Sequence, residues 1–156
     1  ERLGRPLAAD FETTLRAAMA LRFRAGVPAM PGALEVLRQL RVPFCVATNG
    51  PRAKVELTLE VSGLLPHLQG RIFSAYEVGS FKPEPGLFLA AAAALGVEPA
   101  RCAVVEDSLP GMQAGLSAGM QVYAVPSREL APAMLDARVR PIASLAALLD
   151  EPWHRA

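Results

Sequence analysis

Short apolar segments alternate with amphipathic helical segments along most of this chain, and this alternation restricts its fold more than any other feature. Predicted strands cover residues 42–48, 71–75, 102–106 and 121–125. Predicted helices cover residues 32–40, 51–63, 85–95 and 109–118, with further helix from 126 to the end. Apolar strands that alternate with helices are typical of a parallel sheet covered on both faces. We therefore expect an α/β fold with a doubly wound parallel sheet.

One further helix precedes this region. It is predicted at residues 10–24, where apolar side chains recur at helical spacing and Asp10 can cap the first turn. The segment after it, AGVPAMPG at residues 25–32, contains two prolines and two glycines. Such a composition is typical of a linker or hinge. The sequence therefore predicts a helical element that a hinge separates from the α/β domain.

Polar side chains stand where the predicted strands end. Thr48 and Asn49 close the strand at 42–48, just before a helix, and a hydroxyl, an amide and backbone N–H groups in that place suit an anion such as phosphate. The alternative is that they only cap the helix that starts at Pro51. Ligands of parallel sheets bind beyond the carboxyl ends of the strands, so we expect these residues near a functional site.

Lys82 stands in the loop GSFKPEP, where Pro83 and Pro85 stiffen the backbone and fix the direction of the lysine. A lysine in a loop can also be simply solvated. Because this loop follows the strand at 71–75, we expect Lys82 to be able to converge on the same site as the strand ends.

Two adjacent carboxylates, Glu106 and Asp107, end the apolar strand at 102–106. Like charges at neighbouring positions repel each other and resist burial. Mg²⁺ would resolve the repulsion, since it takes oxygen ligands from one or two carboxylates together with water and phosphate. The alternative is that Asp107 or Ser108 caps the helix entered through Pro110, which leaves Glu106 unexplained.

The helix after these carboxylates contains Gly111, Gly115 and Gly119, four residues apart. Each glycine inside a helix costs about 1 kcal/mol relative to alanine. We expect a close approach of this helix to its neighbours to offset that loss.

Three segments resemble the second, third and fourth motifs of the haloacid dehalogenase superfamily: FCVATNGP, FKPEPGLF and CAVVEDSLPGMQAG. They are most similar to the subgroup with a helical cap, which includes sugar phosphatases and β-phosphoglucomutase-like proteins. The resemblance covers about Pro31 to Val125. It implies that residues 1–26 are the last part of the cap, 27–31 the hinge, and 32–156 the α/β core.

The resemblance also implies a role for each motif residue. Thr48 would hydrogen-bond the transferring phosphoryl group, with help from Asn49, and Lys82 would neutralise the phosphate and the nucleophile. Asp107 would bind Mg²⁺, and Glu106 would be a direct ligand or act through a metal-bound water. The implied function is a Mg²⁺-dependent phosphatase for a small phosphorylated metabolite. A sugar-phosphate mutase and a non-catalytic phospholigand-binding protein are the alternatives.

The first motif of the family, an Asp-x-Asp-Gly-Thr run on the central strand, does not occur in this sequence. None of its four aspartates, at positions 10, 107, 136 and 150, stands in such a context. In the family this strand lies between the strands that end at Thr48 and Asp107, and it supplies the attacking aspartate. We therefore expect that the nucleophile and the central strand lie outside this sequence, and that the fragment alone is inactive and poorly folded unless another chain fills the gap.

Composition and charge exclude several other classes of function. The formal net charge is +1, which gives no electrostatic basis for binding nucleic acid or an anionic membrane. The longest stretch of apolar residues and glycine, 87–97, is too short to span a bilayer. Cys45 and Cys102 both lie in apolar segments and read as core thiols of a protein in a reducing compartment, so we expect a cytoplasmic protein.

Overall fold

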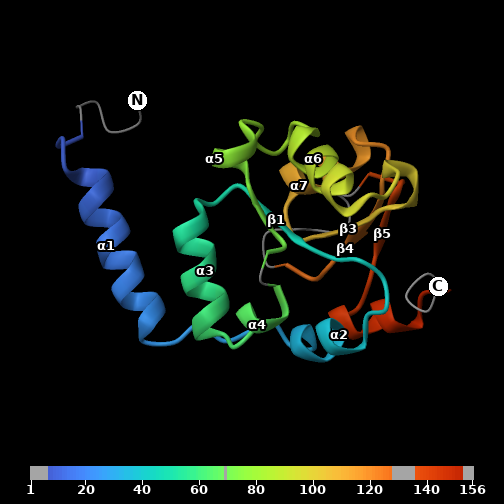
Figure 1. Ribbon diagram of the computed structural model, residues 1–156, viewed down its shortest axis with the longest axis horizontal. Coiled ribbons are helices and arrows are strands. Elements are labelled where there is room, and N and C mark those ends of the chain that lie inside the picture. Colours follow the sequence, from blue (N-terminus) through green and yellow to red (C-terminus); the bar gives the residue numbers. More distant parts are fainter. Residues whose placement is uncertain (1–6, 69, 128–135, 153–156) are drawn as a thin grey trace.

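The structure, a computed structural model, describes residues 7–68, 70–127 and 136–152 of the chain. Its strands are all parallel and form two sheets (Figure 1). One sheet consists of β1 (Val46–Thr48) and β2 (Ile72–Ser74). The other has the order β3-β4-β5, with strands at Ala103–Glu106, Gln121–Ala124 and Val139–Pro141. Within the described residues, β1 pairs only with β2 and β3 pairs only with β4.

Helices cover both faces of the three-stranded sheet because its strands are apolar on both sides. Val122 and Ala124 of β4 pack against α6 (Gly86–Leu95) and α7 (Leu109–Ser117). The alternate residues Tyr123 and Val125 face the opposite layer. That layer contains α2 (Ala33–Gln39) and the 3₁₀ helix η3 (Leu145–Asp150), which lie together in Figure 1. This three-layer arrangement confirms the predicted α/β class.

Helices α3 (Arg52–Val61) and α1 (Phe11–Arg24) lie side by side at one end of the molecule (Figure 1). Lys54 of α3 lies over the ring of Phe23 of α1, with its ammonium nitrogen 5.8 Å from the ring centroid. No residue of α1 is buried. Asp10 stands at the N-cap of α1, but its side chain makes no capping hydrogen bond, so that part of the helix prediction is wrong. The remaining short elements are α4 (Leu65–Leu68), α5 (Ala75–Val78) and the 3₁₀ helix η1 (Pro99–Arg101).

The two ends of the predicted α/β region differ most from the structure. The strand predicted at 42–48 is reduced to β1, and the part that is lost includes Pro43, which has no N–H to donate to a ladder. The prediction of helix from 126 to the end is wrong, because β5 and η3 occupy part of that segment. Its residues 128–135 and 153–156 lie outside the described part of the chain. No helix in the described residues is long and apolar enough to cross a membrane.

Gly111 and Gly115 in α7 and Gly119 just after it are glycines for two reasons, close packing and a left-handed backbone. A Cβ on Gly111 would lie 2.1 Å from Cδ of Glu106, and a Cβ on Gly115 would lie 2.8 Å from Cγ2 of Val122. The predicted close approach is therefore confirmed at both positions. Gly119 has no such neighbour; its φ of +72° marks a left-handed turn after the helix.

Candidate active site

The polar residues singled out in the sequence lie at the carboxyl ends of β1 and β3 and in the loop between α5 and α6. Thr48 ends β1 and Glu106 ends β3. Hydrogen bonds join Lys82, in the loop, to Asn49 on one side and to Glu106 on the other. The structure thus brings Asn49, Lys82 and Glu106 into contact, and Thr48 and Asp107 directly adjoin them in the chain.

The Lys82 ammonium group donates a hydrogen bond to Oε1 of Glu106 and forms an ion pair with it. The side chains are 11% and 8% exposed, so the pair is largely removed from water. The ring of Phe88 lies 4.8 Å from the ammonium nitrogen, and the Ser108 hydroxyl donates to Oε2 of Glu106 at 2.9 Å. Both carboxylate oxygens of Glu106 therefore have a donor. The alternative that Lys82 is a solvated loop lysine is wrong.

Ser108 connects this carboxylate to the first turn of α7. While its proton is donated to Glu106, its oxygen accepts the N–H of Gly111 at 3.2 Å. The prediction that Ser108 or Asp107 caps the helix is confirmed for Ser108. Because a Cβ at position 111 would overlap the Glu106 carboxylate, only glycine lets this carboxylate lie against the helix. Asp107 is exposed beside the buried Glu106.

Thr48 and Asn49 are used differently from N-capping residues. The Asn49 carboxamide donates from Nδ2 to the Lys82 carbonyl at 3.1 Å and accepts the Lys82 N–H on Oδ1 at 2.9 Å. The Thr48 hydroxyl oxygen accepts the N–H of Gly50 at 3.0 Å, which leaves its own proton available to a ligand. Helix α3 begins after Pro51 with no side-chain capping bond. The capping alternative for Thr48 and Asn49 is therefore wrong.

Ser74, the last residue of β2, supports the loop after β1, and the sequence analysis missed it. Its side chain is completely buried. The hydroxyl donates to the Gly50 carbonyl at 2.8 Å and accepts the Tyr76 N–H at 3.3 Å. Its only signal in the sequence is that a small polar residue stands near the end of a predicted strand, and serine is common at such positions without a supporting role.

Arg52 makes a second connection between the same two segments. Its guanidinium donates to both carboxylate oxygens of Glu77 at 2.5 and 2.6 Å, and to the Ile72 carbonyl at 2.8 Å. The hydrogen bonds from Arg52 lower the pKa of Glu77, and those to Glu77 raise the pKa of Arg52. The loop after β1 is thus fixed to β2 and α5 through two independent sets of bonds.

Comparison with known proteins identifies the family of the chain. A sequence model described as hydrolase, haloacid dehalogenase-like hydrolase, matches residues 3–119, which include all the site residues above. The chain belongs to this family. The match spans the strand-end residues of this haloacid dehalogenase-like (HAD-like) chain, and the roles of these residues are part of the proposed function.

Three relatives illustrate the similarity. The 6-phosphogluconate phosphatase of Escherichia coli K12 is 35% identical over 114 residues, which are 73% of this chain and 52% of the relative. Hexitol phosphatase A of the same organism is 36% identical over 104 residues, 64% of this chain and 47% of the relative. A crystal structure of a HAD family hydrolase from Deinococcus radiodurans R1, with bound phosphate and sodium, has a TM-score of 0.77 and 35% identity. That alignment covers 90% of this chain and 66% of that structure. The chain spans about half the length of the two curated phosphatases.

The residues at the candidate site can be compared with the ligands that a metal ion prefers. Mg²⁺ is commonly held by one or two carboxylates, with water and substrate phosphate oxygens completing the octahedron. Asp107, exposed at the end of β3, fits such a role, whereas both oxygens of Glu106 already accept hydrogen bonds. No group of three or more histidine, cysteine or acidic side chains that could hold a metal occurs in the described residues.

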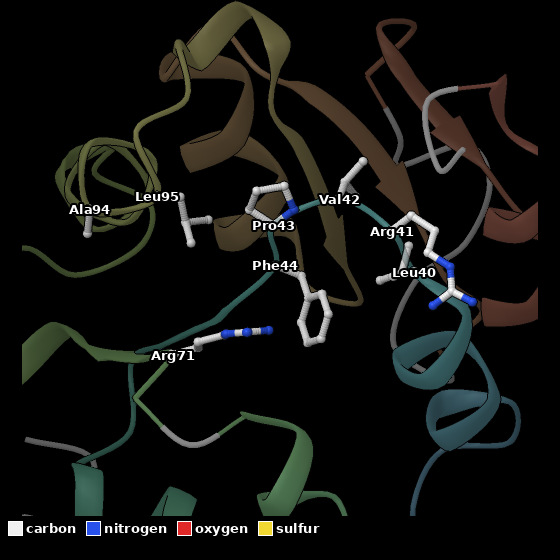
Figure 2. Close-up of a pocket in the computed structure, with 8 residues that line it drawn as sticks. All are labelled: Leu40, Arg41, Val42, Pro43, Phe44, Arg71, Ala94 and Leu95. Carbon is white, nitrogen blue, oxygen red and sulfur yellow. The ribbon is translucent and has the colours of Figure 1, made fainter. Parts of the chain in front are cut away.

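A cavity of about 490 Å³ lies away from this site. Figure 2 shows its lining residues, which precede β1 and β2 or end α6: Leu40, Arg41, Val42, Pro43, Phe44, Arg71, Ala94 and Leu95. The guanidinium of Arg71 points to the ring of Phe44, 4.9 Å from its centroid (Figure 2). Because β1 and β2 are parallel and these residues precede them, this cavity lies at the amino ends of the two strands, opposite the end that carries Thr48. It is therefore not part of the candidate active site.

Proposed function

We propose that this chain carries the phosphate-binding part of a HAD-like phosphatase that hydrolyses a small phosphorylated metabolite. The observation that carries this proposal is the ammonium group of Lys82, held at the carboxyl edge of the strands by buried Glu106 and, through the backbone, by Asn49. A positive charge fixed in advance stabilises the negative charge that develops on a phosphoryl group during transfer. A solvated lysine would first have to lose side-chain freedom.

Thr48 is the second ligand of the phosphoryl group in this proposal. Its hydroxyl accepts the Gly50 N–H, so its proton can be donated to a phosphate oxygen from a fixed direction. The phosphate would lie between Thr48 and Lys82, at the edge of the sheet where α/β proteins bind their ligands. The phosphate bound in the similar Deinococcus structure supports this choice of ligand.

We further propose that Asp107 binds Mg²⁺. When bound, this ion would neutralise part of the charge on the substrate phosphate. Asp107 supplies a carboxylate that is exposed to solvent next to the Lys82–Glu106 pair. Glu106 would contribute to the ion through the pair or through a water molecule, because its oxygens already accept hydrogen bonds from Lys82 and Ser108.

We infer that the nucleophile is an aspartate on a strand outside this sequence. Its carboxylate oxygen would form a bond to phosphorus as the ester oxygen leaves, and water would then release phosphate from the aspartyl-phosphate. The separation of β1 and β3 into different sheets supports this proposal, since a strand between them would join the two sheets into one. Residues 1–26 would then be the last part of a cap, with 27–31 as its hinge.

The substrate class in this proposal is a phosphorylated sugar or polyol. Two of the curated relatives are named for such substrates, 6-phosphogluconate and hexitol phosphates. The near-neutral net charge of the chain gives no electrostatic support for a nucleic-acid or membrane partner.

Hydrolysis of p-nitrophenyl phosphate by the full-length protein, with and without Mg²⁺, tests the proposal. We expect turnover that requires Mg²⁺ and that is lost in Asp107→Asn and in Lys82→Ala. Asp136→Asn is the matched control, since Asp136 is an exposed aspartate that pairs with Arg138. No hydrolysis in either condition would favour a phospholigand-binding protein. Transfer of phosphate to a sugar in place of water would identify a mutase.

A further inference from the structure

We infer that the side chain of Asn49 acts on the substrate through Lys82, as a positioning residue that holds the backbone of the lysine. This inference rests on the proposed function, in which Lys82 contacts the phosphoryl group. It changes the role that the resemblance implied for Asn49, which was direct help in holding that group.

The contact between the two residues is reciprocal. The Asn49 carboxamide donates to the carbonyl of Lys82 and accepts the N–H of the same residue, at 3.1 and 2.9 Å. A primary amide has one donor side and one acceptor side, so it can exchange two hydrogen bonds with the N–H and C=O of a single residue. Directly opposite residues of two antiparallel strands exchange two bonds in the same way. One Nδ2–H and the Oδ1 of the Asn49 side chain therefore bind the backbone of Lys82, although 33 residues separate them, and the second Nδ2–H is not used in this contact.

Lys82 needs this support because it stands in a loop and carries a long side chain. A lysine loses up to about 2 kcal/mol of side-chain conformational freedom when it is ordered. Glu106 and Phe88 fix its ammonium end, and Asn49 fixes its backbone end. The two residues that fix Lys82 come from different strands, since Asn49 follows β1 and Glu106 ends β3.

The position of Asn49 next to Thr48 makes the contact useful for binding. Thr48 and Asn49 belong to one rigid loop, which Ser74 holds through Gly50. By binding the backbone of Lys82, Asn49 fixes the distance between the Thr48 hydroxyl and the lysine loop. The two proposed phosphate ligands, from segments far apart in the sequence, are then presented together.

A double-mutant cycle tests this inference in the full-length enzyme, with p-nitrophenyl phosphate as substrate. The variants are Asn49→Ala, Lys82→Ala and the double variant, and kcat and KM are measured for each. A misplacement of about 1 Å in a catalytic group can lower the rate about 10²-fold, so we expect a loss of that order for Asn49→Ala. We expect the double variant to match Lys82→Ala within about twofold, because residues that act as one unit are not additive. Losses that multiply would overturn the inference, since Asn49 would then act without Lys82.

A second cycle shows that the first has not simply reached the lowest measurable rate. Thr48→Val combined with Lys82→Ala removes two proposed ligands that contact the phosphate separately. We expect this double variant to fall below Lys82→Ala by about the factor that Thr48→Val shows alone. The same variants can be titrated with inorganic phosphate by calorimetry, and the affinities should follow the same two patterns.

Amide hydrogen exchange of Lys82 gives a measurement that does not depend on activity. The N–H of Lys82 is donated to Asn49, so its exchange should become faster in Asn49→Ala and stay unchanged in Thr48→Val. Unchanged exchange in Asn49→Ala would overturn the inference even in an active enzyme. If the wild-type enzyme hydrolyses no phosphomonoester, the proposed function fails, while the exchange experiment still decides whether Asn49 holds Lys82.

Discussion

Lys82 and Glu106 form an ion pair in which both charged side chains are largely withdrawn from water, at 11% and 8% exposure. The two adjacent carboxylates at the end of β3 therefore differ in role. Glu106 is neutralised by a residue of the same chain, and Asp107 faces solvent. A phosphoryl group that binds beside Lys82 would contact an ammonium group that Glu106 already holds in position.

Replacement of Lys82 by methionine should destabilise the fold as well as abolish activity. Breaking a buried pair leaves one charge uncompensated, which typically costs about 3–5 kcal/mol in free energy of unfolding. The double variant Lys82→Met with Glu106→Gln should recover part of this loss, because a neutral amide can still accept the Ser108 hydroxyl bond. Urea denaturation measures both effects. A double variant no more stable than Lys82→Met would show that the buried carboxylate is not the source of the loss.

Gly111→Ala should disturb the site, whereas Gly115→Ala should disturb only the packing of α7. The new methyl group would lie 2.1 Å from Cδ of Glu106 in the first case and 2.8 Å from Cγ2 of Val122 in the second. Overpacking of this kind typically costs about 1–3 kcal/mol. Thermal denaturation should therefore show both variants to be destabilised. In kinetic assays well below their melting temperatures, kcat should fall for Gly111→Ala alone; equal kcat values would contradict the role assigned to Gly111.

The elements with strong sequence patterns could be predicted, and those without them could not. The helices α3, α6 and α7 have clear starts and ends in the sequence, and the strands β3 and β4 are short apolar runs of the kind that a buried parallel sheet needs. The strand β5 consists of Val-Arg-Pro, which has neither an apolar run nor the alternation of a strand. It forms a strand because it pairs with the free edge of β4, and that edge exists only once the sheet has folded.

In the candidate site, the residues themselves could be predicted from the sequence, but not all of their contacts. Thr48, Lys82, Glu106 and Asp107 could be chosen from their places at strand ends and from the motifs. The pairing of Glu106 with Lys82, 24 residues away, could not be predicted. This contact depends on how the loop before α6 folds back toward the end of β3. The repulsion between two neighbouring carboxylates pointed to a cation, and the nearest cation proved to be a side chain of the chain itself.

Ser74→Ala should weaken both the fold and the site. It leaves the Gly50 carbonyl and the Tyr76 N–H without their partner, and an unsatisfied buried polar group costs about 1–3 kcal/mol. Because Gly50 adjoins the Thr48 loop, we expect a lower kcat as well. Ser62→Ala is the matched control, since its hydroxyl donates to the Leu59 carbonyl at the end of α3, away from the site. A full kcat for Ser74→Ala in the folded enzyme would contradict the supporting role of this hydroxyl.

Cys45 should be a slow target for alkylation in the folded protein at neutral pH. Burial, and to a lesser extent the nearby Cys102, raises the pKa of the Cys45 thiol to about 11, so the reactive thiolate is scarce. Since the folded state binds this proton more tightly than the unfolded state, the thiol contributes stability at neutral pH. That contribution is lost as the pH rises from about 9 to about 11. Iodoacetamide labelling followed by mass spectrometry at pH 7.5, with and without urea, measures the protection. The Cys102→Ser variant serves as control, and folded Cys45 that reacts as fast as in urea would contradict the prediction.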